Sequence, residues 1–149
     1  MTEIRKATIK DLDLVVELFD KYRVFYEKES DMENATEFIS DRLKLNDSEI
    51  IVAETDRKSL VGFVQLYPIF SSTRMQRLWL LNDLFLDKEF RGKGISKQLI
   101  ESTKEFCKLT NACGLILETA KTNIIGNELY PKVGFSLDNE HNYYSCDNN

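Results

Sequence analysis

Residues 90–100, Phe-Arg-Gly-Lys-Gly-Ile-Ser-Lys-Gln-Leu-Ile, place two glycines at the entrance to a helix-like stretch. The first turn of a helix has unpaired backbone N–H groups and a partial positive charge, so it attracts anions. Glycine lets the backbone come close to such an anion, and Arg91 and Lys93 add two cations. The stretch therefore predicts a pyrophosphate site, with a plain connecting turn and two solvated cations as the alternative.

Two common nucleotide-binding motifs do not fit this turn. A Walker loop requires G-x-x-x-x-G-K-[ST], which the sequence lacks. A dinucleotide-binding fingerprint requires a third glycine where Lys97 stands, and it opens the first strand–helix–strand unit, whereas this turn lies at mid-chain. Both nucleotide-binding interpretations are therefore weak.

Apolar spacing on either side of the turn predicts a mixed α/β protein. Leu12, Val15, Val16 and Phe19 recur at helical spacing, whereas residues 78–87 are apolar on both faces and indicate a central, doubly covered strand. The expected strands are residues 3–8, 49–55, 60–70, 78–87, 113–119, 134–137 and 143–146. The expected helices are residues 11–28, residues 32–45, about fifteen residues after the glycine turn, and residues 123–133. This β-αα-βββ-α-β-α-ββ order calls for a mixed sheet with a strand–helix–strand crossover at the glycine turn.

The composition is that of a globular protein, with 149 residues, 42% hydrophobic and 30% charged. This length favours one domain over residues 1–149. A net charge of −5 argues against general nucleic-acid binding, and no stretch is apolar enough for a membrane span. Three cysteines without a CxxC pair, and an N-terminus without an apolar signal core, fit a reducing cytoplasm. We expect a cytoplasmic protein without a nucleic-acid or membrane partner.

Residues 82–101, NDLFLDKEFRGKGISKQLIE, resemble the acetyl-CoA-binding core of the GCN5-related N-acetyltransferase (GNAT) family. That core ends its fourth strand with an apolar triplet and continues as R/Q-x-x-G-x-G/A. Arg91 and Gly94 match the motif, and Ser96 stands where Gly or Ala is usual.

The family's second signature, N-x-x-A-x-x-L-Y-x-x-x-G-F, resembles residues 123–135, NIIGNELYPKVGF. Gly126 stands in place of the usual alanine. The matching residues are Asn123, Leu129, Tyr130, Gly134 and Phe135. Because two signatures occur in the family's element order and at its separation, the chain is identified as a member with the GNAT acyl-CoA N-acyltransferase fold.

The resemblance implies acetyl-CoA as the co-substrate and no metal. In the family, the pantetheine arm makes strand-like bonds to strand four, where strands four and five splay apart, and the pyrophosphate lies at the glycine turn. The cofactor-binding residues carried over are Leu84, Phe85, Leu86, Arg91, Gly92, Lys93, Gly94, Ile95, Ser96, Lys97 and Asn123. Asn123 has a second interpretation, as the N-cap of the last helix.

The implied reaction is direct attack of a neutral primary amine on the thioester carbon, which expels the CoA thiolate. Tyr130 occupies the family's position for the acid that protonates this thiolate. The alternative for Tyr130 is packing in the core with its hydroxyl at the rim.

Asp83 lies inside the apolar stretch LWLLNDLFL, where an unpaired carboxylate is costly. One interpretation is a structural ion pair with Arg74 or Arg77. The other is a catalytic group that orients or deprotonates an ammonium substrate, directly or through water. The stretch is similar to the diamine and polyamine acetyltransferases, in which two acidic residues are consecutive here, and Asn82 replaces the first.

Acidic residues dominate the expected helix pair, with eight acids and three bases from Glu17 to Asp41. Such a field attracts a polyamine or another cationic amine, and a solvated helix face is the alternative. Five aromatic residues either line a pocket here or belong to the core: Tyr22, Phe25, Tyr26, Tyr67 and Phe70. We expect a small cationic amine as the acceptor. The alternatives are a protein amine, an aminoglycoside-like drug, or a non-catalytic acyl-CoA-binding module, and the resemblance also allows a homodimer.

Overall fold

In the computed structural model, which describes residues 1–148, five strands form one sheet in the order β1-β2-β3-β4-β5. The chain divides into two compact units, residues 1–118 and the residues from Thr119 onward. The first unit contains β1 (Thr2–Lys6), η1 (Ile9–Asp11), α1 (Leu12–Phe25), α2 (Met32–Leu45), β2 (Glu49–Thr55), β3 (Leu60–Ser71), β4 (Gln76–Leu86), η2 (Lys88–Phe90), α3 (Ile95–Leu109) and β5 (Leu115–Ile116). The second unit contains α4 (Ile124–Lys132).

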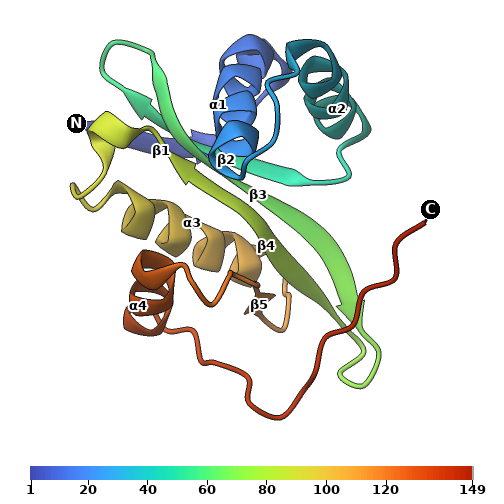
Figure 1. The fold of residues 1–149 in the computed structure, drawn as a ribbon. Helices are drawn as coiled ribbons and strands as arrows, with labels where there is room; N and C mark the ends of the chain where they lie inside the picture. Colours follow the sequence, from blue (N-terminus) through green and yellow to red (C-terminus); the bar gives the residue numbers. More distant parts are fainter. Residues whose placement is uncertain (149) are drawn as a thin grey trace. The chain divides into compact units, whose positions relative to one another are not determined.

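The sheet of the first unit is mixed. Strands β1 to β4 are antiparallel neighbours, and β5 runs parallel to β4. A parallel pair needs a crossover connection, which α3 supplies. The helices α1 and α2 lie on one face of this sheet and α3 on the other (Figure 1), so the predicted strand–helix–strand crossover at the glycine turn is confirmed.

Hydrophobic burial on both faces explains why these segments fold as they do. Val15, Leu18 and Phe19 of α1 are buried against Val52 and Phe63 of β2 and β3. On the opposite side of the molecule, α3 buries its apolar stripe, which consists of Ile95, Leu99, Ile100 and Cys107. Of the helices that the structure describes, none is long and apolar enough to cross a membrane.

The end of the chain differs from the expected order. Residues 134–137 and 143–146 form no strand, and the strand expected at residues 113–119 is reduced to Leu115–Ile116. Local hydrogen bonds replace a ladder in the segment between the two expected strands. The Asp138 carboxylate accepts hydrogen bonds from the backbone N–H groups of Glu140 (2.8 Å) and His141 (3.2 Å). Such a local turn competes with strand pairing for backbone groups.

Candidate active site

Asp83 follows an irregularity in β4. In the β3–β4 ladder Gln65 pairs with Asp83 and Leu66 pairs with Leu81, so Asn82 is an extra residue on β4. Such a bulge bends its strand and redirects the side chains that follow. Because paired residues share a face, Asp83 points with Gln65 toward α1 and α2, whereas Leu81 shares the opposite face with Leu66.

The Asp83 carboxylate is buried and receives hydrogen bonds from two amides. Gln65 Nε2 donates to Asp83 Oδ2 at 2.7 Å, and Asn82 Nδ2 donates to Oδ1 at 2.8 Å. Ser48 Oγ in turn donates to Gln65 Oε1 at 3.1 Å. Asp83 is 2% exposed and Gln65 is fully buried. Neutral donors therefore compensate for the burial of this carboxylate.

The structural ion pair that the sequence allowed for Asp83 is not formed. Among residues 1–148, Asp83 has no ion-pair partner, and neither Arg74 nor Arg77 reaches it. The Arg77 guanidinium lies instead over the rings of Phe70 and Trp79, at 5.3 and 5.2 Å from their centroids. The negative charge of Asp83 is thus left without a cation in the described part of the chain.

Two tyrosines face Asp83. Burial raises the pKa of Tyr22, and the charge of the neighbouring Asp83 carboxylate raises it further. Burial also raises the pKa of Tyr67, and the charge of Asp83 adds to the effect. Both phenols are therefore neutral hydrogen-bond donors at physiological pH, not bases.

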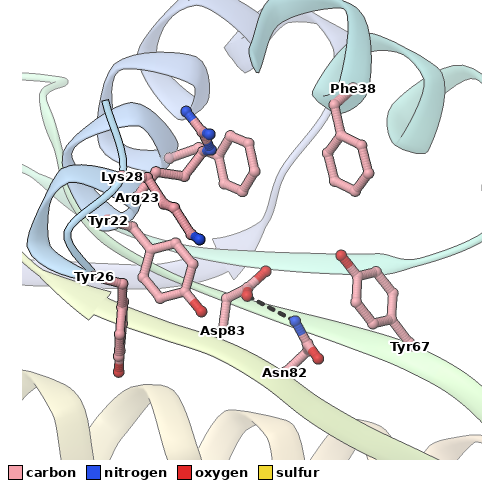
Figure 2. Close-up of a pocket in the computed structure, with 9 residues that line it drawn as sticks. Tyr22, Arg23, Tyr26, Lys28, Phe38, Tyr67, Asn82 and Asp83 are labelled. Carbon is pink, nitrogen blue, oxygen red and sulfur yellow. Dashed lines mark hydrogen bonds between the residues drawn. The ribbon is translucent and has the colours of Figure 1, made fainter. Parts of the chain in front are cut away.

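A cavity of about 340 Å³ opens over Asp83 on the α1–α2 side of the sheet. Its lining is largely aromatic and carries three charged groups, and it consists of Phe19, Tyr22, Arg23, Tyr26, Lys28, Phe38, Tyr67, Asn82 and Asp83. Figure 2 shows the side chains of Asp83 and Tyr22 reaching into this space from β4 and α1. None of the eight acidic residues from Glu17 to Asp41 lines it.

The glycine turn presents an uncapped helix N-terminus. Gly92 and Gly94 have left-handed φ values of 75° and 80°, and a Cβ at either position would meet no atom within 4 Å. Gly94 is the N-cap of α3, and no side chain in the described residues caps this helix. The first N–H groups of α3, at Ile95, Ser96 and Lys97, therefore have no side-chain cap in the described residues, as an anion site requires.

Arg91 has a structural role that the sequence did not indicate. Its Nε donates to the Leu86 carbonyl oxygen at 2.9 Å. Its guanidinium lies over the rings of Phe25 and Phe85, at 5.3 and 5.8 Å from their centroids. Arg91 thus ties the glycine turn to the end of β4 and to α1.

The β5 side of β4 is only partly paired. Within the first unit β5 pairs with Trp79 and Leu80 alone, so β4 continues from Leu81 to Leu86 with only β3 as a neighbour. Leu84, Phe85 and Leu86, which the resemblance assigns to the pantetheine arm, lie in this segment. Of their backbone groups that point away from β3, all but the Leu86 carbonyl oxygen, which accepts from Arg91 Nε, are available for a strand-like ligand.

The second unit contains the remaining predicted residues. Asn123 caps α4, because its Oδ1 accepts from the Gly126 N–H at 3.1 Å, while its Nδ2 donates to Thr119 Oγ1 at 2.8 Å. The Tyr130 ring lies edge-on to Phe135, with 5.8 Å between centroids. A contact of Asn123 with the cofactor and the catalytic role of Tyr130 stay predictions.

Comparison with known proteins decides the family. Residues 13–135 match the model described as the Acetyltransferase (GNAT) family. The chain belongs to this family. It is 36% identical over 141 residues to an uncharacterized N-acetyltransferase of Bacillus subtilis (strain 168), covering 95% of this chain and 94% of that one. The predicted GNAT fold is confirmed, and the protein is an acyl-CoA-dependent N-acetyltransferase.

Solved structures agree with this assignment. The crystal structure of a probable acetyltransferase, 34% identical, superposes with a TM-score of 0.94 and covers 99% of this chain and 98% of that chain. A predicted acetyltransferase from Clostridium acetobutylicum, solved with acetyl-CoA, is 21% identical with a TM-score of 0.79, covering 97% and 96% of the two chains. That second likeness concerns the fold alone.

Three polar residues of this GNAT site escaped sequence reasoning. Gln65 had a usable signal, because it is the one amide inside the apolar stretch at residues 60–70. Arg23 and Lys28 had none, since each is one of several charged residues in and just after α1. Residues 1–148 contain no group of three or more His, Cys, Asp or Glu side chains that is placed to hold a metal ion.

Proposed function

We propose that this N-acetyltransferase transfers an acetyl group from acetyl-CoA to the primary amine of a small molecule, and that Asp83 receives the cationic ammonium. The supporting observation is the buried Asp83 carboxylate, which faces the cavity with hydrogen bonds from neutral amides alone. A buried carboxylate without a cation attracts a cationic ligand. The aromatic faces of Tyr22 and Phe38 add cation–π attraction.

The cavity favours a small acceptor over an extended one. Its volume of about 340 Å³ is at the lower end of the range for small-molecule sites. A free amine fits such a space, and Tyr67 and Tyr22 can donate hydrogen bonds to the rest of the acceptor.

The proposed acetyl-CoA site uses backbone groups. The free edge of β4 at Leu84, Phe85 and Leu86 binds the pantetheine arm as an added strand would. The pyrophosphate lies on the N-terminus of α3, at Gly92, Lys93, Gly94, Ile95, Ser96 and Lys97. Arg91 holds this turn in place through its hydrogen bond to the Leu86 carbonyl oxygen.

In the proposed reaction, Asp83 takes the proton of the bound ammonium, directly or through one water, so that the nitrogen becomes nucleophilic. The amine nitrogen then forms a bond to the thioester carbon, the carbon–sulfur bond breaks, and the electron pair leaves with sulfur. The new amide nitrogen releases its extra proton to water, which balances the proton that Tyr130 gives to sulfur. Tyr130 donates a proton to that sulfur, which prevents the reverse attack. Backbone N–H groups of β4 stabilise the negative charge that develops on the carbonyl oxygen.

The proposal is tested by release of CoA thiol from acetyl-CoA in the presence of diamines, polyamines, amino acids, aminoglycosides and short peptides. We expect turnover with small primary amines. Tyr130→Phe lowers kcat by about 100-fold because the acid is lost, while calorimetry shows unchanged acetyl-CoA affinity. Tyr144→Phe, whose ring is 90% exposed, serves as the matched control.

Two outcomes contradict parts of this proposal. Unchanged turnover in Tyr130→Phe removes Tyr130 from the mechanism. Acetyl-CoA binding without acetylation of any amine in the panel makes the chain a binding module and overturns the catalytic assignment of Asp83.

A further inference from the structure

We infer that the acceptor carries an oxyanion, a carboxylate or a phosphate, in addition to its primary amine, and that Arg23 and Lys28 bind this oxyanion. The inference rests on the proposed function, because it concerns the other end of the same cavity. It replaces a purely cationic acceptor, such as a polyamine, with a zwitterionic one.

A helix-capping motif joins the backbones of Arg23 and Lys28. The Lys28 N–H donates to the Arg23 carbonyl oxygen at 3.0 Å, and the Glu27 N–H donates to the Val24 carbonyl oxygen at 3.0 Å. Glu27 has a left-handed φ of 63°. This is the Schellman arrangement, which turns the chain back over the last turn of the helix. The main chains of Arg23 and Lys28, five residues apart in sequence, are thus held next to each other.

The Arg23 side chain is oriented as well. Its Nη1 donates to the Glu29 carbonyl oxygen at 3.0 Å, which uses one of the five guanidinium N–H donors. The remaining donors stay available for a planar oxyanion, which a guanidinium binds with two parallel hydrogen bonds. Both Arg23 and Lys28 line the cavity that contains Asp83 (Figure 2).

No carboxylate among residues 1–148 forms an ion pair with either of these cations, Arg23 and Lys28. Asp20, the buried acid on α1, accepts instead from Ser30 Oγ at 2.6 Å and from the Asp31 N–H at 2.8 Å. None of the acidic residues of the helix pair lines the cavity beside these two cations.

One acid near Arg23, Asp31, has a lowered pKa. Hydrogen bonds from Asn34 lower the pKa of Asp31, and the Arg23 charge contributes further. Its carboxylate is nevertheless bound to the Asn34 N–H and side chain at the start of α2, and Asp31 does not line the cavity.

The cavity therefore holds two cations and one carboxylate, at Arg23, Lys28 and Asp83. A diamine whose first ammonium lies at Asp83 brings its second ammonium into a site with like charges, which is unfavourable. An amine with an oxyanion at its far end pairs with both ends of the cavity.

The test compares kcat/KM for propyl, pentyl and heptyl series of four matched acceptors: alkylamine, diamine, ω-amino acid and aminoalkyl phosphate. We expect an oxyanion-bearing acceptor to exceed the alkylamine of the same length by about tenfold or more, since one charge-assisted contact contributes that much. The diamine is the poorest. Comparison of the ω-amino acid with the aminoalkyl phosphate shows whether the site prefers a carboxylate or a phosphate. A preference for diamine or plain alkylamine at every length overturns the inference.

Two substitutions test whether Arg23 and Lys28 cause the preference for an oxyanion-bearing acceptor. Lys28→Gln and Arg23→Gln each lower the ratio of kcat/KM for the oxyanion acceptor to that for the alkylamine by about fivefold or more. Lys28→Gln is the decisive variant, because Arg23→Gln also loses the bond to Glu29. Arg57→Gln, in the exposed β2–β3 turn, is the matched control and leaves the ratio unchanged.

The outcomes separate this inference from the proposed function. Acetylation with an unaltered ratio in Lys28→Gln overturns the oxyanion site alone and leaves the enzyme assignment in place. Acetylation of no acceptor at all contradicts the proposed function, and with it this inference.

Discussion

Gln65 orients the Asp83 carboxylate, because it is the middle member of a hydrogen-bond chain that runs from Ser48 to Asp83. Ser48 donates to Gln65 Oε1, and Gln65 donates to Asp83 Oδ2, so the amide has one correct orientation while Asp83 is ionised. Both Gln65 and Asp83 are buried, and a change of charge at either one is therefore felt strongly. The sequence signals for these two residues are alike, since each interrupts an apolar strand.

The substitution Gln65→Glu places a second carboxyl group against Asp83. Burial and the like charge raise the pKa of the introduced carboxyl in the folded state above its ordinary value of about 4.3. The destabilisation is therefore absent at low pH and grows as the pH rises through the ordinary value. We expect the free energy of unfolding to fall by about 3 kcal/mol near pH 8, measured by urea denaturation.

Gln65→Met is the control for this pH dependence. It removes the hydrogen bond to Asp83 without adding a charge, so its loss of stability varies less with pH. Equal stability of Gln65→Glu and the wild type across the pH range would show that the Gln65–Asp83 contact is not buried in solution.

At the scale of elements, β3 and β4 approach each other closely at Gly62. A Cβ at Gly62 would lie 2.9 Å from the Phe85 carbonyl oxygen and 2.8 Å from Leu86 Cδ1. The first of these atoms belongs to the backbone, which cannot rotate away as a side-chain end can. Gly62 therefore lets β3 and β4 pair at the segment proposed for the pantetheine arm.

We expect Gly62→Ala to lower the free energy of unfolding by about 1–3 kcal/mol, because the added methyl group overpacks the pair of strands. Urea denaturation measures the change. Gly114→Ala is the matched control, since its Cβ would meet only Leu78 Cδ1 at 3.7 Å, an ordinary contact. A Gly62→Ala protein as stable as the control would mean that β4 moves freely away from β3.

Elements with strong local patterns were predictable, and elements defined by distant partners were not. The expected strands at 49–55 and 60–70 closely match β2 and β3, because a buried strand in a sheet centre has a continuous apolar run. The expected strands at 134–137 and 143–146 failed, since a strand exists only through its pairing. The charges of the cavity could not be predicted from the sequence for a similar reason. Which charged residues of α1 and of the turn after it face the cavity depends on helix packing, and Arg23 and Lys28 are the cations that line it.

At the scale of the whole molecule, binding of acetyl-CoA is linked to stability. A ligand that binds only the folded state stabilises it by about 2.7 kcal/mol when its concentration is 100 times Kd. If the pyrophosphate binds at Gly94 as proposed, a substitution of Gly94 changes how much acetyl-CoA stabilises the fold. Both asparagine and aspartate adopt left-handed φ values, so the two substitutions differ mainly in charge.

We expect Gly94→Asp to lose most of the rise in Tm that acetyl-CoA causes, whereas Gly94→Asn keeps more of it. The carboxylate repels the pyrophosphate at the start of α3, and calorimetry then shows an affinity about tenfold or more below that of Gly94→Asn. High salt reduces the difference in acetyl-CoA affinity between the two variants, because it screens the charge of the aspartate. Equal ligand-induced shifts in both variants contradict a pyrophosphate at this turn.

The extra residue in β4, Asn82, can change without changing the pairing of the sheet. Leu81 and Asp83 pair with consecutive residues of β3, so the ladder closes on either side of Asn82 without its help. Asn82 is therefore an extra residue that the hydrogen-bond network of the sheet does not require, placed next to the carboxylate that we propose meets the substrate. A lineage can exchange this side chain, and with it the surroundings of the acceptor nitrogen, while the framework of the fold stays as it is.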